Sequence, residues 1–182
     1  AHRINSISKL KKLNPDYGIE IDIRDDKKDL VVVHDPFRKG IKLKHYLKYY
    51  NHKLIIANIK SERIEDEVIK MFKKFNVNNF FFLDSSFPKI IDLVKKNISD
   101  IGLRVSYYED LSTAKKLKNK IKWIWYDTFF GLPKNNYDFK ILKKMNYKIC
   151  LVCPMLHGLD LKISHKRLSE LKKNHRTDHT VH

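Results

Sequence analysis

The sequence predicts an α/β fold, a small TIM (β/α)₈ barrel that forms a single domain over residues 1–182. Short runs of β-branched and aromatic residues alternate with longer Lys-rich amphipathic segments, which is typical of parallel strands joined by crossover helices. Seven such units, with an eighth short run at 178–182, agree with the strand number of a barrel. Because these barrels usually have about 250 residues, the short chain predicts a barrel that is minimal or truncated at its C-terminus.

The expected elements follow this alternation along the chain. Strands are predicted at 1–4, 17–24, 54–60, 79–84, 101–106, 122–127 and 147–153, with an additional apolar run at 30–34. Helices are predicted at 6–14, 43–50, 61–75, 87–97, 111–119, 136–145 and 161–173. A doubly wound open sheet is the alternative fold. The chain has only five Gly and no Gly-rich loop after a strand, so a dinucleotide site is not expected.

The charge of the chain is strongly positive but unevenly placed. The formal net charge is +17, yet residues 1–35 are neutral and only seven of the 38 basic residues are Arg. Recognition of phosphate and base edges relies on Arg, so no specific nucleic-acid partner is expected. The Lys-rich helices could instead attract anionic substrates or a lipid surface, so peripheral membrane contact is one possible interaction. The excess of Lys could equally reflect an AT-rich coding sequence. The sequence does not predict the oligomeric state.

The composition favours a globular cytoplasmic domain. Hydrophobic residues make up 42% of the chain, which excludes disorder. No apolar run reaches the roughly 20 residues that a membrane helix needs. Two Cys indicate a reducing compartment.

The strand expected at 17–24 carries acidic residues on one face. Its isoleucines share one face, whereas Glu20, Asp22 and Arg24 share the other, because strand side chains alternate. Carboxylates inside a barrel need a cation. A divalent metal ion would serve, since hard cations bind carboxylate oxygens. The alternative is an ion pair with one of the basic residues Arg3, Arg24, Lys60 or Arg104.

Polar residues also stand at the ends of other expected strands, and in a barrel these ends meet at one mouth. Asn58 and Lys60 share a face at the end of the third strand, and His2 and Arg3 lie in the first. The remaining candidates for a substrate pocket are Asp84, Arg104, Trp125, Asp127 and His157. Trp125 could equally be a core residue, and His157 could equally be an ordinary loop histidine.

His34 ends an apolar run and is a candidate acid or base, because an unperturbed imidazole titrates near neutrality. With His2 it would form a pair beside a carboxylate-held metal, with Arg and Lys close by. Such a set suits phosphodiester chemistry: cations neutralise phosphate, one His takes a proton from the nucleophile, and the other protonates the leaving oxygen.

Residues 1–60 resemble the glycerophosphodiester phosphodiesterase family, of the phosphatidylinositol-phospholipase-C-like phosphodiesterase superfamily, which adopts the TIM barrel. The matching segments are Ala1-His2-Arg3, Gly18-Ile19-Glu20-Ile21-Asp22, Val33-His34-Asp35 and Lys60. The resemblance implies that His2 and His34 are the catalytic histidines and that Glu20 and Asp22 bind the metal. It further implies that Arg3 and Lys60 contact the substrate phosphate.

Two positions depart from that family. Ile4 stands where Gly is usual, and Asn58 stands where a metal-binding Glu is usual. Asn58 offers a carbonyl oxygen without charge, so a Mg²⁺ or Ca²⁺ ion would have two carboxylates, with Asp84 or Asp35 as replacement ligands.

The function expected from these residues is that of a metal-dependent hydrolase in lipid metabolism. Its substrate would be a small-molecule or lipid-derived phosphodiester of the glycerophosphodiester type. The alternatives are a divergent protein that binds a phosphate-containing ligand, and a phospholipase-D-like lyase that forms a cyclic phosphate.

Overall fold

The computed structural model describes residues 1–131, 137–159 and 179–181. The chain divides into two compact units, Ala1–Leu93 and Val94–His182. Each unit contains its own sheet and is described by itself.

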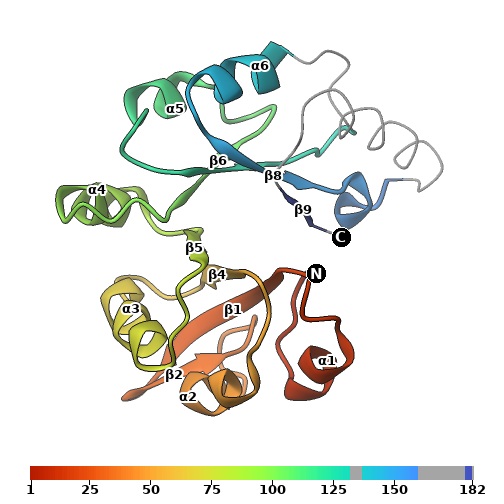
Figure 1. The fold of residues 1–182 in the computed structure, drawn as a ribbon, viewed down its shortest axis with the longest axis vertical. Helices are drawn as coiled ribbons and strands as arrows, with labels where there is room; N and C mark the ends of the chain where they lie inside the picture. Colours follow the sequence, from red (N-terminus) through yellow and green to blue (C-terminus); the bar gives the residue numbers. More distant parts are fainter. Residues whose placement is uncertain (132–136, 160–178, 182) are drawn as a thin grey trace. The chain divides into compact units, whose positions relative to one another are not determined.

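The first unit is built on a mixed five-stranded sheet (Figure 1). Its strands are β1 (Ile19–Asp26), β2 (Asp29–Val32), β3 (Ile41–Lys42), β4 (Ile55–Ile59) and β5 (Phe80–Leu83). The strand order is β3-β2-β1-β4-β5. The pairs β1/β4 and β4/β5 are parallel, whereas β1/β2 and β2/β3 are antiparallel.

Helices precede, connect and follow these strands, and the last of them extends past the end of the first unit. They are α1 (Ile7–Lys12), α2 (Leu43–Tyr46), the 3₁₀ helix η1 (Leu47–Tyr49), α3 (Glu65–Lys74) and α4 (Phe87–Lys95). The α1 helix begins after Ser6, whose side chain accepts a hydrogen bond from the Lys9 amide. The α3 helix begins at Glu65, later than the sequence predicts, and three acidic residues fill its first turn, where the helix dipole favours negative charge.

The second unit contains a parallel sheet in the order β6-β7-β8-β9. The strands are β6 (Gly102–Val105), β7 (Trp123–Tyr126), β8 (Lys148–Val152) and β9 (His179–Val181). Its helices are α5 (Ser112–Lys116), α6 (Tyr137–Lys144) and the 3₁₀ helix η2 (Pro154–His157). The strand expected at 178–182 is confirmed as β9, and the helix expected at 161–173 lies outside the described residues.

The alternation predicted for β1 is confirmed. Ile19, Ile21 and Ile23 have no exposed surface, and neither have Glu20 and Asp22 on the opposite face. Both faces of this strand are therefore buried, and two carboxylates lie within the interior of the first unit.

The predicted TIM barrel is wrong. The described strands form two separate sheets, and neither closes on itself. The apolar run at 30–34 is the main reason in the first unit, since it forms β2 and pairs antiparallel with the end of β1. The local alternation of strands and helices predicts an α/β class, which the structure has. Barrel closure, by contrast, depends on long-range pairing of the edge strands.

The N-terminal segment predicted as a strand lies along β1 without being a regular strand. The Glu20 amide donates to the carbonyl of Ala1 (2.8 Å), and the Ile4 amide donates to the carbonyl of Glu20 (2.9 Å). Arg3, between them, has a left-handed backbone with φ of 50°, which interrupts the ladder. Among the described helices, none has the length and apolar character needed to cross a membrane.

Candidate functional site

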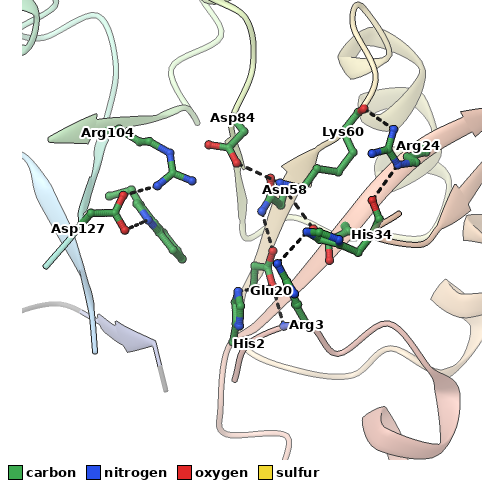
Figure 2. A network of polar contacts seen from close by, with 12 residues as sticks. His2, Arg3, Glu20, Arg24, His34, Asn58, Lys60, Asp84, Arg104 and Asp127 are labelled. Atoms are coloured by element: carbon green, nitrogen blue, oxygen red, sulfur yellow. Dashed lines mark hydrogen bonds and ion pairs between the residues drawn. The ribbon is translucent and has the colours of Figure 1, made fainter. Parts of the chain in front are cut away.

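The side chains of Glu20 and Asp22 project from the centre of the first sheet beside β4. Asp22 pairs in register with Asn58 of the neighbouring parallel strand, so their side chains lie on the same face. The family resemblance assigned these three residues to one metal site, and the structure brings them together (Figure 2).

Glu20 accepts two hydrogen bonds. The backbone amide of Arg3 donates to its Oε2 (2.7 Å), and the Asn58 side-chain amide donates to its Oε1 (2.8 Å). Burial raises the pKa of Glu20, and the nearby Asp22 carboxylate raises it further. The left-handed conformation of Arg3 accompanies this contact, in which the Arg3 peptide N–H points toward the Glu20 carboxylate.

Asp22 is held by Asn5 through two hydrogen bonds. The Asn5 side-chain amide donates to Asp22 Oδ2 (2.6 Å), and the Asp22 backbone amide donates to Asn5 Oδ1 (3.0 Å). Asp22 Oδ1 is buried and accepts no hydrogen bond within the described part of the chain, and the same is true of Asn58 Oδ1. The site thus contains two buried oxygen atoms that lack a hydrogen-bond donor, a costly arrangement unless a cation or another donor binds them.

Lys60 lies beside this acidic group. Its ammonium is 3.1 Å from Asp84 Oδ2 and 3.8 Å from Asp22 Oδ1. The sequence left an ion pair as the alternative to a metal ion beside these carboxylates. The structure contains such a pair in part, and its cation is Lys60 rather than Arg24. The distance to Asp22 exceeds that of a hydrogen bond, so this ion pair does not satisfy Asp22 Oδ1.

His34 lies between Arg3 and Asp35. A terminal nitrogen of Arg3 is 2.7 Å from His34 Nε2, and His34 Nδ1 is 2.7 Å from Asp35 Oδ1. Because a guanidinium only donates, Nε2 must be the acceptor. Nδ1 is then the ring nitrogen that donates to Asp35. The hydrogen bond from His34 also lowers the pKa of Asp35.

His2 lies on the other side of Glu20. Its Nε2 is 3.7 Å from Glu20 Oε2, too far for a hydrogen bond. Burial lowers the pKa of His2, and the positive charge of Arg3 lowers it further. Figure 2 shows both histidines and Arg3 grouped around the Glu20 carboxylate.

Sequence reasoning missed two positioning residues. Asn5 orients Asp22, and Arg24 donates to the carbonyls of His34 (2.9 Å) and Lys60 (2.7 Å). Arg24 therefore ties the two strand ends that carry His34 and Lys60. The sequence pattern could have indicated Arg24, because it lies on the same face of its strand as Glu20 and Asp22. It could not have indicated Asn5, because the left-handed turn at Arg3 breaks the strand periodicity just before it.

The departures from the family pattern have local explanations. Ile4 is a buried core residue, and Tyr46 donates a hydrogen bond to its carbonyl (2.6 Å). The expected replacement ligands are engaged elsewhere, since Asp84 binds Lys60 and Asp35 binds His34.

The remaining pocket candidates form a separate cluster in the second unit. Asp127, almost fully buried, accepts hydrogen bonds from Arg104 and from Trp125 Nε1 (3.1 Å), and His157 Nε2 is 3.4 Å from it. Trp125 is buried as a core residue. The structure therefore groups Arg104, Trp125, Asp127 and His157 and places Asp84 with the first site.

The donor set in the first unit consists of oxygen atoms, the ligand type that hard divalent cations prefer. Asp22 Oδ1 and Asn58 Oδ1 are buried oxygens without donors, and Glu20 adds a second carboxylate. Within the described residues, no three His, Cys, Asp or Glu side chains converge as metal ligands. Any ion would thus depend on the Asn58 amide oxygen as its third protein ligand.

Compared with models of known protein families and with curated proteins, the chain matches none.

Proposed function

We propose that this protein is a metal-dependent phosphodiesterase whose reaction centre is the His2, Arg3, Glu20, Asp22 and His34 cluster of the first unit. The observation that carries the proposal is the state of His34. Its Nε2 presents a lone pair toward Arg3 while Asp35 holds the proton on Nδ1. An oriented imidazole next to a phosphate-binding cation is the arrangement that general-base catalysis on a phosphodiester requires.

In this reaction, Arg3 moves its guanidinium from His34 Nε2 to a phosphate oxygen, which exposes the Nε2 lone pair. His34 then removes the proton from the attacking hydroxyl group, a water molecule or a neighbouring alcohol of the substrate. The bond from that oxygen to phosphorus forms while the bond from phosphorus to the leaving alcohol breaks. Protonated His2 donates its proton to the leaving oxygen, and because burial and Arg3 lower the pKa of His2, mildly acidic conditions favour this step.

Glu20, Asp22 and Asn58 would hold the divalent cation, which supplies positive charge to neutralise the phosphate. Lys60 adds a second positive charge on the same face. Asn5 and Arg24 act as positioning residues, because they orient Asp22 and the main chain around His34.

The substrate class we propose is a glycerophosphodiester-type molecule, either a lipid head group or a glycerophosphate-containing compound. A cytoplasmic location accompanies this proposal, supported by two buried cysteine thiols, Cys150 and Cys153, that form no disulfide.

The test is turnover of bis(p-nitrophenyl) phosphate and glycerophosphodiesters with Mg²⁺, Ca²⁺ or Mn²⁺. His34→Ala and His2→Ala should each lower kcat by about 10²-fold or more, since general acid–base groups contribute about 10²–10⁴-fold. His45→Ala is the matched control, because His45 is exposed and its ring contacts Tyr49. Full activity in both histidine variants would contradict the assignment.

Two alternative functions use the same site. A ligand-binding protein is favoured by Asn58 at a position where a third carboxylate would strengthen the metal site, and it predicts no turnover by the wild-type protein with any metal. A lyase predicts a cyclic phosphate as the final product. Phosphorus NMR of the products distinguishes the lyase from the hydrolase.

A further inference from the structure

The turn that follows His34 presents an aromatic ring to solvent. Phe37 is fully exposed, and its φ of 59° places it in the left-handed region. This conformation is unfavourable for a bulky residue, and the exposed ring gains no burial to offset it. Single exposed apolar side chains are ordinary, so the surroundings of Phe37 decide what it means.

The turn is fixed at both of its ends. The Arg24 guanidinium donates to the carbonyl of His34 (2.9 Å) just before it. Just after it, Gly40 packs tightly on β2: a Cβ atom there would lie 2.9 Å from Val31 Cβ and 3.0 Å from the Val32 carbonyl oxygen. Only glycine allows this approach. The residues on either side of the turn are therefore held in place.

Four exposed basic residues lie in the turn of Phe37 and in the turn between β1 and β2, and the exposed Asp25, Asp26 and Asp35 lie beside these turns. Arg38 and Lys39 follow Phe37 and are exposed, and Lys27 and Lys28 are exposed in the turn between β1 and β2. We call these five residues the Phe37 surface. It combines one apolar ring with four cations, the composition of surfaces that bind anionic lipid interfaces.

A pocket of about 450 Å³ lies between these two turns. Lys27, Phe37, Arg38 and Lys39 contribute to its walls, and so do Arg24 and Asp35, which contact His34. Asp25 and Asp26 also line it, so its charge is mixed. His34 itself does not line the pocket, but two of the pocket's wall residues, Arg24 and Asp35, hold His34 by hydrogen bonds to its carbonyl and its ring.

We propose that the Phe37 surface docks the protein on an anionic lipid bilayer. The Phe37 ring enters the boundary between headgroups and acyl chains, and the four cations contact anionic headgroups. This inference rests on the proposed function and sharpens it: a catalytic His34 beside a docked bilayer makes a membrane-borne phosphodiester the substrate class.

The experiment is co-flotation of the full chain with phosphatidylcholine vesicles that contain or lack phosphatidylglycerol. We expect binding only to the anionic vesicles, and we expect it to weaken as the NaCl concentration rises from about 50 to about 500 mM, since salt screens surface charge. Phe37→Ser should lower the partition coefficient about tenfold or more, because the burial of a phenyl ring is lost. The double variant Arg38→Ala, Lys39→Ala should lower it about tenfold.

Two matched controls test whether vesicle binding depends on the Phe37 surface or on any exposed ring and any pair of exposed cations. Tyr17→Ser removes another exposed ring of the same unit, and Lys73→Ala with Lys74→Ala removes two exposed cations at the end of α3. Both should bind vesicles as the wild-type protein does. Wild-type behaviour of Phe37→Ser, or equal losses in the controls, would overturn the proposal.

Further outcomes distinguish this inference from the proposed function. Turnover of a soluble diester by wild-type protein that does not bind anionic vesicles would overturn the docking surface and leave the phosphodiesterase standing. Vesicle binding without turnover would overturn the phosphodiesterase and leave the docking surface standing. Self-association that Phe37→Ser abolishes, without vesicle binding, would assign the surface to a second copy of the chain and overturn the lipid proposal.

Discussion

Asp22 in the first unit and Asp127 in the second are both buried carboxylates at the heart of a polar cluster, but their oxygens are satisfied differently. Arg104 and Trp125 donate to the two oxygens of Asp127, and His157 lies close by. Asp22 has donors on Oδ2 only, and its Oδ1 is buried without one in the described residues.

This difference concerns the capacity of each carboxylate to bind a further ligand. A carboxylate with hydrogen bonds on both oxygens and a paired charge has little capacity for a further ligand, whereas a buried oxygen without a donor destabilises the fold until something binds it. We therefore expect Asp127 to stabilise the second unit and Asp22 to serve binding. Five variants, with one control variant, test this contrast and the site around Asp22.

The largest effect is expected from Asp127→Asn. The substitution keeps the shape of the side chain but removes the charge that pairs with Arg104, which should lower the free energy of unfolding by about 2 kcal/mol. Urea denaturation measures the loss, and the response of the melting temperature to Mg²⁺ or Ca²⁺ should stay unchanged. Asp22→Asn is the comparison and should do the opposite, with little loss of stability and a weaker metal response. Equal losses of stability in both variants would remove the contrast.

Asn58→Asp should strengthen metal binding about tenfold or more, because a third carboxylate joins Glu20 and Asp22. Without metal the same variant should be less stable, since three carboxylates then repel one another in a buried site. Calorimetric titration with Mg²⁺ and Ca²⁺ and thermal unfolding in chelator give the two readings. Asn78→Asp makes the same change at an exposed position and should alter neither. Unchanged metal affinity in Asn58→Asp would contradict the metal site.

A smaller effect with a defined pH dependence is expected from Glu20→Gln. Burial raises the pKa of Glu20 above its usual 4.5, so the stabilisation from the protonated carboxyl is complete below pH 4.5 and is lost as the pH rises through the raised value. Glutamine does not ionise and avoids this loss. In chelator, Glu20→Gln should therefore match wild type near pH 4 and exceed it near pH 7.5 in urea unfolding. A pH-independent difference would show that ionisation of Glu20 is not the cause.

The smallest effect concerns the titration of His2. Burial and Arg3 together hold its pKa below the usual 6.5. Arg3→Ala should raise that pKa only part of the way, because burial is the larger cause and remains in the variant. An NMR titration of the imidazole signals measures it. No change in the His2 midpoint would indicate that Arg3 does not act on His2.

The elements of the fold and most of the first site were predictable because they depend on local patterns. Alternation along 17–24 placed Glu20 and Asp22 on one face, and the structure buries both. The segments that resemble a known family also named His2 and Lys60, which lie 3.7 Å from Glu20 and 3.8 Å from Asp22, and His34, which contacts Arg3. Asn5 was not predictable, since the left-handed turn at Arg3 that directs it to Asp22 has no signal in the periodicity.

The sequence by itself therefore determined the α/β class, most of the strand positions and the residue types of the candidate site, all of which follow from side-chain periodicity over a few residues. Only the tertiary structure decided how the strands pair, which replaced the expected barrel by two sheets, and which oxygens remain without a donor. Both depend on contacts between residues far apart in the chain. The hydrogen bond from Asn5 to Asp22 and the pairing of β1 with β2 are two examples. In each case several donors and acceptors could pair with the same groups, and only the folded chain decides which of them do.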